Sequence, residues 1–124
     1  MIYIIDDDQS VLKALKLLLN AAGFNATAFF SAREFLEQSN ISNNDCIILD
    51  LSMPDISGFD LIERLSVKGI DPKIIVITAY DDVEKREQAW RMKASAFLTK
   101  PVDDQALIDT IKWILQSEEE NIRT

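Results

Sequence analysis

The stretch at residues 46–54 (C-I-I-L-D-L-S-M-P) constrains the fold more than any other part of the chain. Three consecutive aliphatic residues, Ile47, Ile48 and Leu49, predict a strand covered on both faces, because a half-exposed strand would alternate polar and apolar residues. Strands of this kind are typical of parallel sheets. Asp50 ends the strand, and the carboxyl ends of parallel strands form the ligand crevice of an open sheet. Asp50 is therefore a candidate reactive carboxylate, although taken alone it is more simply interpreted as a surface loop acid.

The remaining apolar segments alternate between strand and helix patterns. Short runs rich in β-forming residues predict strands at residues 1–5, 24–29, 73–78 and 95–99. Apolar residues at helical spacing predict helices at residues 11–22, from 31 onward, from 59 to about 69, at 81–92 and at 107–115. Five strands alternating with five helices predict a doubly wound α/β domain built on a parallel sheet.

Local signals mark the ends of several predicted helices. Asp8 or Ser10 is expected to cap the first helix, and Gly23 to end it. The sequence Ser31-Ala32-Arg33-Glu34 fits a capping box. The helix at residues 81–92 has a narrow apolar stripe, and we expect it to be marginally stable.

Length and charge indicate one acidic domain. The chain has 124 residues, of which we assign 1–116 to the domain and 117–124 to a polar, frayed tail that would suit a linker. The net charge of −8 disfavours direct binding of nucleic acid. No apolar run reaches the roughly 20 residues needed to span a bilayer, and no leader is recognisable, so we expect a cytoplasmic protein.

Two residue types restrict the possible chemistry. Histidine is absent, which excludes catalysis by Ser-His-Asp or Cys-His and any histidine-ligated metal within the chain. The single cysteine, Cys46, opens a buried strand and is interpreted as a small core residue. Any divalent cation would have to be bound by oxygen atoms.

Polar residues stand at the ends of four predicted strands, and parallel strands bring such ends to one edge of the sheet. They are Asp6 and Asp7, Asp50, Thr78 and Lys100. Clustered carboxylates need a counter-charge, for which Mg²⁺ is the natural candidate. A cation, a lysine and a hydroxyl around one carboxylate would suit phosphoryl transfer, with Asp50 as nucleophile.

Each of these residues also has a simpler interpretation. The acids at residues 6–8 could favour a helix N-terminus, Thr78 could merely end its strand, and Lys100 could be a solvated surface charge. Their joint occurrence at successive strand ends favours a shared site.

The sequence resembles a response-regulator receiver domain of bacterial two-component signalling over residues 1–115. The pieces that carry the resemblance are I-I-D-D-D at 4–8, L-D-L-S-M-P at 49–54, S-G-F-D-L at 57–61, I-T-A at 77–79 and A-F-L-T-K-P at 96–101. The sequence at 97–101, followed by two aspartates at 103–104, is most similar to that of receivers attached to helix-turn-helix output domains of the nitrogen-fixation regulator type. The resemblance implies a flavodoxin-like sheet of order 2-1-3-4-5.

The resemblance also implies roles for the acids. Asp50 would take a phosphoryl group from a phosphohistidine on a sensor histidine kinase. Asp7, Asp50 and the backbone carbonyl of Ser52 would bind Mg²⁺ directly, and Asp6 partly through water.

Further residues would contact the phosphoryl group or transmit the signal. Thr78 and the Ala79 N–H would hold phosphoryl oxygens, Lys100 would pair with the group, and Lys100-Pro101 would be a cis peptide at the switch region. Thr78 would move inward and Phe97 would rotate into the vacated space. Because Phe97 lacks a hydroxyl, packing alone would decide its position; a permanent core role is the alternative.

Similarity to the family implies that the signal leaves through the face of the fourth helix, fifth strand and fifth helix. Trp90, Phe97 and Trp113 are the candidate partner residues on this face, because tryptophan is enriched at interface hot spots. Both tryptophans could instead pack under loops. We expect phosphorylation to promote homodimerisation and thereby to control a C-terminal DNA-binding output domain.

Lys93 departs from the family pattern, which has glycine after the fourth helix. A side-chained residue must therefore adopt the left-handed conformation there, or the turn must differ.

The expected protein is a signalling domain and not a turnover enzyme. A Mg²⁺-dependent phosphohydrolase is the enzymatic alternative, but Ser52 stands where such enzymes usually have a second acid. A phosphorylation-independent interaction module is the other alternative.

Overall fold

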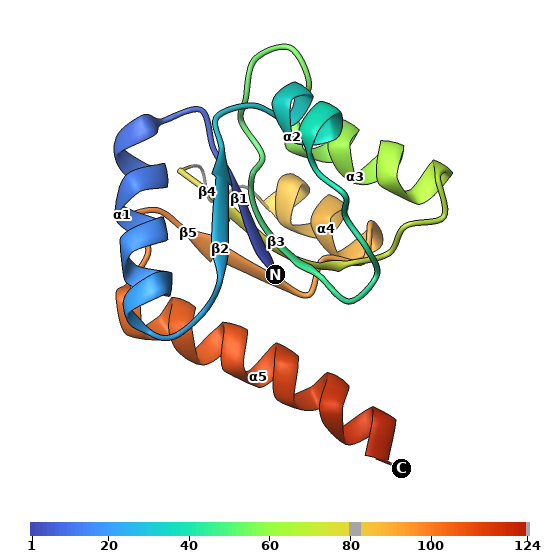
Figure 1. Cartoon of the computed structure of the whole chain (residues 1–124). Coiled ribbons are helices and arrows are strands. Elements are labelled where there is room, and N and C mark those ends of the chain that lie inside the picture. Colours follow the sequence, from blue (N-terminus) through green and yellow to red (C-terminus); the bar gives the residue numbers. More distant parts are fainter. Residues whose placement is uncertain (80–82, 124) are drawn as a thin grey trace.

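The computed structural model describes residues 1–79 and 83–123. Within these ranges strands and helices alternate in the order β1 (Ile2–Ile5), α1 (Gln9–Ala21), β2 (Ala26–Phe29), α2 (Ala32–Gln38), β3 (Cys46–Asp50), α3 (Gly58–Val67), β4 (Lys73–Thr78), α4 (Val83–Arg91), β5 (Ala96–Thr99) and α5 (Asp104–Arg123). All neighbouring strands pair in parallel, in the order β2-β1-β3-β4-β5 (Figure 1). The predicted doubly wound, flavodoxin-like sheet is confirmed.

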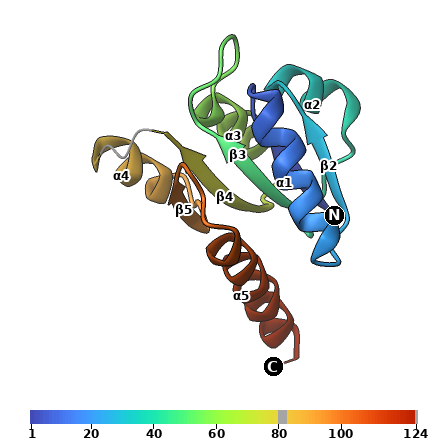
Figure 2. The same ribbon diagram turned by 90° about the vertical axis from the view of Figure 1, so that its left-hand side faces the viewer.

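Helices cover both faces of the sheet and create two cores. Helices α1 and α5 lie on one face of the sheet and α2, α3 and α4 on the other (Figure 2). Side chains of the first pair form one core with Ile48 and its neighbours, and those of the other three form a second core with Ile47 and Leu49. All five residues of β3 are buried. The unbroken apolar run that opened the sequence analysis is thus explained by burial on both faces at the centre of the sheet.

The helix starts follow from short polar side chains. Asp8 caps α1 and accepts hydrogen bonds from the backbone N–H groups of Ser10 and Val11, so Asp8, not Ser10, is the cap. Ser31 caps α2 as predicted, but the Glu34 carboxylate accepts from the N–H of Phe30, one residue before the cap. The Asp8 and Ser31 side chains satisfy donors that the first helical turn leaves unpaired, whereas the Glu34 bond lies outside the helix.

Three helices end in the same left-handed turn. In each, the residue after the cap has a positive φ: +93° at Gly23, +76° at Gly69 and +67° at Lys93. At the third turn the N–H of Ala94 donates to the carbonyl of Ala89, the six-to-one bond of a Schellman motif. Of the two alternatives that the sequence left open, a side-chained residue in the left-handed conformation is the one that the structure shows.

Helix α4 buries little of its surface, and α5 extends past the sheet. The predicted start of α4 at residue 81 lies outside the described residues; from Val83 to Arg91 only Ala89 is buried, which confirms the narrow stripe. The C-terminal part of α5 projects beyond the rest of the domain (Figures 1 and 2).

Helix α5 is longer than the predicted helix at residues 107–115, and the assignment of residues 117–124 to a tail or linker stays a prediction. Helix α5 continues through residue 117 and ends at Arg123. Residues 116–123 contain neither glycine nor proline and include glutamine, glutamates and arginine, which are good helix formers. Polarity alone therefore did not mark a helix end.

Within residues 1–79 and 83–123, no helix combines the length and apolar character required to cross a membrane.

Replacing Lys93 by glycine should stabilise the protein by about 0.5–1 kcal/mol, because glycine adopts a positive φ without the steric cost borne by a side chain. Lys112→Gly is the matched control: it removes the same charge from an exposed position of α5 and should destabilise by about 1 kcal/mol. Urea unfolding measures both changes. Equal destabilisation by the two substitutions would contradict a strained turn at Lys93.

Candidate functional site

The carboxyl ends of the central strands place the predicted polar residues along one edge. Asp6 follows β1 directly, Asp50 is the last residue of β3 and Thr78 the last residue of β4. In the sheet register, Asp50 pairs with Ile77, so Thr78 lies one residue further along the same edge. Asp6, Asp50 and Thr78 are the polar residues buried in the described part of the chain.

Lys100 joins the two buried acids. Its Nζ lies 2.8 Å from Asp6 Oδ2 and 3.3 Å from Asp50 Oδ2. The backbone N–H of Lys100 donates to the carbonyl of Thr78 at 2.8 Å, which ties the end of β5 to the end of β4. The Lys100 ammonium therefore contacts carboxylates at the ends of β1 and β3, and the Lys100 backbone is held by a hydrogen bond to the end of β4.

Backbone donors hold the other oxygens of these acids. The N–H of Asp8 donates to Asp6 Oδ1 at 2.9 Å, and the N–H of Ser52 donates to Asp50 Oδ1 at 3.1 Å. Hydrogen bonds of this kind stabilise ionised carboxylates and fix their orientation. Both side chains are therefore preorganised by the loops that follow their strands.

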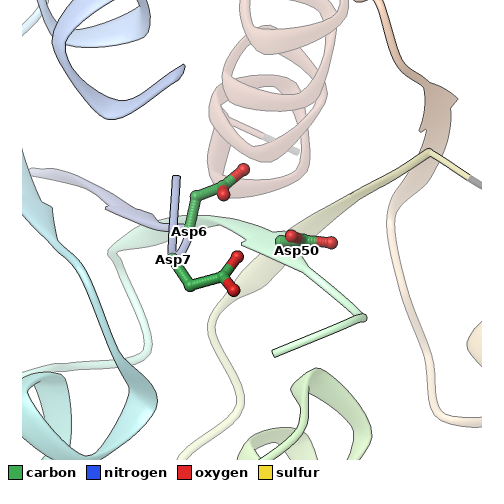
Figure 3. Close-up of side chains that lie close together, drawn as sticks. All are labelled: Asp6, Asp7 and Asp50. Atoms are coloured by element: carbon green, nitrogen blue, oxygen red, sulfur yellow. The ribbon is translucent and has the colours of Figure 1, made fainter. Parts of the chain in front are cut away.

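The three acids fit a divalent cation. One carboxylate oxygen from each of Asp6, Asp7 and Asp50 lies within 4.8 Å of the other two; Figure 3 shows the three side chains. Asp6 Oδ2 is buried, and among the described residues it receives no well-directed hydrogen bond; its contact with Lys100 is an ion pair. Three carboxylates against one ammonium leave an excess of two negative charges, and oxygen donors are those that Mg²⁺ prefers.

The pKa of Asp50 is raised above its ordinary value. Burial is the largest cause, and the negative charge of Asp6 adds to it, while the Ser52 N–H and Lys100 act in the opposite direction. For Lys100, burial lowers the pKa, but the contacts with Asp6 and Asp50 outweigh burial and the net shift is upward. The lysine therefore stays charged, and the Asp50 carboxylate is held in an environment that penalises its negative charge.

Gly58 supports the site through a close backbone approach that sequence reasoning missed. A Cβ at this position would lie 2.7 Å from the Asp50 carbonyl oxygen and 2.8 Å from Leu51 Cα, closer than real Cβ atoms come. The Gly58 N–H also donates to the Leu51 carbonyl. The available signal was a glycine at the first position of a helix, where alanine is the better helix former.

Other predicted site residues lie beside this cluster. Ala79 follows Thr78 and is exposed, and Ser52 contributes the N–H already described. The Lys100-Pro101 peptide is cis, as the resemblance implied. The roles of Ser52, Ala79 and Pro101 toward a phosphoryl group stay predictions.

The predicted partner residues lie apart from the acids, on α4, β5 and α5. Trp90 is 50% exposed and Trp113 is 66% exposed, so neither is packed under a loop. Phe97 is half-buried and packs against the core on the α4 side of the sheet. The roles of these three side chains toward a partner or in a switch stay predictions.

A five-stranded parallel sheet with buried acids and a lysine at its carboxyl edge defines the class of receiver-like α/β signalling domains. The family model described as "Response regulator receiver domain" matches residues 2–112. The chain belongs to this family. It is a receiver domain of the two-component response regulators.

Curated relatives agree with this assignment. The transcriptional regulatory protein FixJ of Azorhizobium caulinodans is 36% identical over 111 residues, covering 90% of this chain and 53% of the relative. The response regulator protein TodT of Pseudomonas putida is 37% identical over 116 residues, covering 94% of this chain and 51% of the relative. The chain thus spans about half the length of these relatives.

Solved structures show the same fold. The response regulator StyR matches with a TM-score of 0.86 and 37% identity, over 98% of this chain and 63% of that one. The crystal structure of FixJ-N matches with a TM-score of 0.81 and 34% identity, over 90% and 89%. The similarity to receivers of the nitrogen-fixation regulator type, predicted from residues 97–104, is confirmed.

Asp50→Asn should stabilise the metal-free protein at neutral pH by about 1 kcal/mol, the usual size for one substitution, because it removes a charge that burial penalises while Lys100 keeps its ion pair with Asp6. The folded-state pKa of Asp50 is raised, so the gain is absent below the ordinary aspartate pKa of about 3.9, where both folded and unfolded chains are protonated. It grows as the pH rises toward the raised value.

Thermal unfolding in EDTA from pH 3 to pH 7 measures this change. Asp7→Asn, at an exposed carboxylate of the same cluster, is the control and should give a smaller gain because water screens Asp7. A destabilised Asp50→Asn variant at pH 7 would contradict the assigned electrostatics.

Proposed function

We propose that Asp50 accepts a phosphoryl group from a phosphohistidine of a sensor histidine kinase. An Asp50 carboxylate oxygen attacks phosphorus, the P–N bond breaks, and its electron pair returns to the imidazole of the kinase, leaving an acyl phosphate on Asp50. The observation that carries the proposal is the buried Asp50 carboxylate at the end of β3, 3.3 Å from the Lys100 ammonium, in a chain of the receiver family.

Asp6, Asp7, Asp50 and the Ser52 carbonyl would hold Mg²⁺ in this site. When bound, the cation supplies positive charge against the oxygens of the transferring group. Lys100, which directly follows β5, supplies a second positive charge, and its ion pairs with Asp6 and Asp50 keep it in place. Thr78 and the Ala79 N–H would receive the phosphoryl oxygens.

Acetyl phosphate with Mg²⁺ should add one phosphoryl group to the protein, and intact-mass spectrometry should show it. Asp50→Asn should abolish the gain, because the acceptor oxygen is lost. Asp7→Asn should slow labelling at least tenfold by weakening the cation site. EDTA should act in the same direction on wild type.

Stoichiometric labelling separates this function from its alternatives. A signalling receiver gains one group and stops, whereas a phosphohydrolase would turn over many equivalents of a small phosphate ester. An interaction module that works without phosphorylation would gain no mass. Labelling that persists in the Asp50→Asn variant would overturn the assignment of the acceptor.

The same proposal extends to the output of the signal. Phosphorylation adds about two negative charges and three acceptor oxygens at Asp50, enough to draw the Thr78 hydroxyl inward and to alter the packing of Phe97. We infer that the face of α4, β5 and α5 then forms a homodimer. Its exposed tryptophans, Trp90 and Trp113, are the aromatic anchors that such an interface needs.

Sedimentation velocity with beryllium fluoride, a phosphoryl mimic, should show a dimer that is absent from the free protein. Trp113→Ala should weaken dimerisation by at least tenfold, whereas Phe30→Ala, at an exposed aromatic residue outside this face, should not. A monomer at high concentration with the mimic bound would remove the dimer from the proposal.

The relatives bear on the full-length protein. The chain spans about half of the transcriptional regulator FixJ, so the proposed output is a C-terminal DNA-binding domain joined through the end of α5. The net charge of −8 supports leaving nucleic-acid binding to that other domain. A cytoplasmic location, where kinase and target genes are both accessible, belongs to the same proposal.

A further inference from the structure

We propose that Arg86, on α4, is a positioning residue that holds Phe97 of β5 and thereby restrains the switch face in the arrangement seen here. The Arg86 Cζ lies 5.2 Å from the centroid of the Phe97 ring. A guanidinium within about 6 Å of an aromatic ring centroid is attracted by the electron-rich face of the ring. This inference rests on the proposed function of Asp50, because it concerns the readiness of the domain to accept a phosphoryl mimic.

Little else of an apolar kind anchors α4. Across Val83–Arg91, Ala89 is the one buried side chain, and Trp90 on the next position is half exposed. An alanine buries a single methyl group, so its contribution is small and of the same order as one cation–π contact. The Arg86–Phe97 contact is therefore one of the contacts that set the position of α4 on the sheet.

Phe97 can be biased by such a contact because the ring has no hydrogen-bonding group. Its partners are the half-buried packing against the α4-side core and the guanidinium above its face. In this chain the cation supplies a directional preference that a hydroxyl could supply in a tyrosine. The sequence led us to expect that packing alone would decide the position of Phe97, and the Arg86 contact adds a second attraction.

The contact also links the two segments that carry the proposed phosphoryl ligands. Helix α4 begins five residues after Thr78, and β5 runs from Phe97 through Thr99 to Lys100. Strand register places Phe97 beside Val76 and Thr99 beside Thr78. A change that draws Thr78 and Lys100 toward an anion at Asp50 therefore acts on both sides of the Arg86–Phe97 contact.

Weakening this contact should favour the anion-bound arrangement. A ligand that must first disrupt a restraining contact binds more tightly when the contact is removed, by the factor that the contact contributed to the equilibrium. For an exposed cation–π contact this factor is about twofold to fivefold. Arg86→Gln should therefore bind beryllium fluoride with Mg²⁺ about twofold to fivefold more tightly than the parent protein.

The experiment uses Trp90 as the reporter. In a Trp113→Phe background, the fluorescence of Trp90 on α4 follows titration with beryllium fluoride at saturating Mg²⁺. Arg91→Gln is the matched control, since it removes an exposed arginine from the same helix without touching Phe97, and it should not tighten binding. Arg86→Lys retains a cation and should fall between the parent and Arg86→Gln.

A second variant tests the partner of the contact. Phe97→Leu removes the ring, so adding Arg86→Gln to it should produce no further tightening, and the two substitutions should be non-additive. Equal affinity of Arg86→Gln and Arg91→Gln, or full additivity with Phe97→Leu, would overturn the inference while leaving phosphorylation of Asp50 intact. A folded parent protein that binds no beryllium fluoride would overturn the proposed function, and the inference with it.

Discussion

The crowding of negative charge at the carboxyl edge of the sheet is the constraint on which the rest of the structure depends. Asp6 and Asp50 are buried on neighbouring strands, and Lys100 bridges them at 2.8 and 3.3 Å. Partial neutralisation by one ammonium leaves the pKa of Asp50 raised by burial and by Asp6. A divalent cation would offset this excess of negative charge, and by doing so would make room for the further negative charge of a phosphoryl group.

Rigid and loosely held elements meet at this edge. β3, which ends in Asp50, is buried along its whole length, and Gly58 lets the following helix pack directly on the Asp50 carbonyl. By contrast, α4 has one buried side chain and reaches β5 through Arg86 and Phe97. In the proposed function, a fixed strand would keep the Asp50 acceptor in register while the surface beside it, formed by a weakly anchored helix, changes.

Much of this could be predicted from local sequence. The unbroken apolar run at residues 46–49 and the helical spacing elsewhere predicted every strand and helix, since period and burial are properties of short segments. Caps were less certain: Asp8 was one of two candidates, and the Glu34 carboxylate bonds one residue earlier than the capping box implied. The end of α5 was misplaced because polar residues were taken as a helix end, although their propensities favour helix through Arg123.

The sequence by itself determined which residues are polar at the strand ends and, through the order of apolar segments, that these ends share one edge. Tertiary structure alone decided that Lys100 contacts Asp6 and Asp50 together, that a Cβ at Gly58 has no room, and that Arg86 covers Phe97. The physical reason is that such contacts depend on the spacing and orientation of packed elements. These are set by how both cores fill, and no local pattern records them.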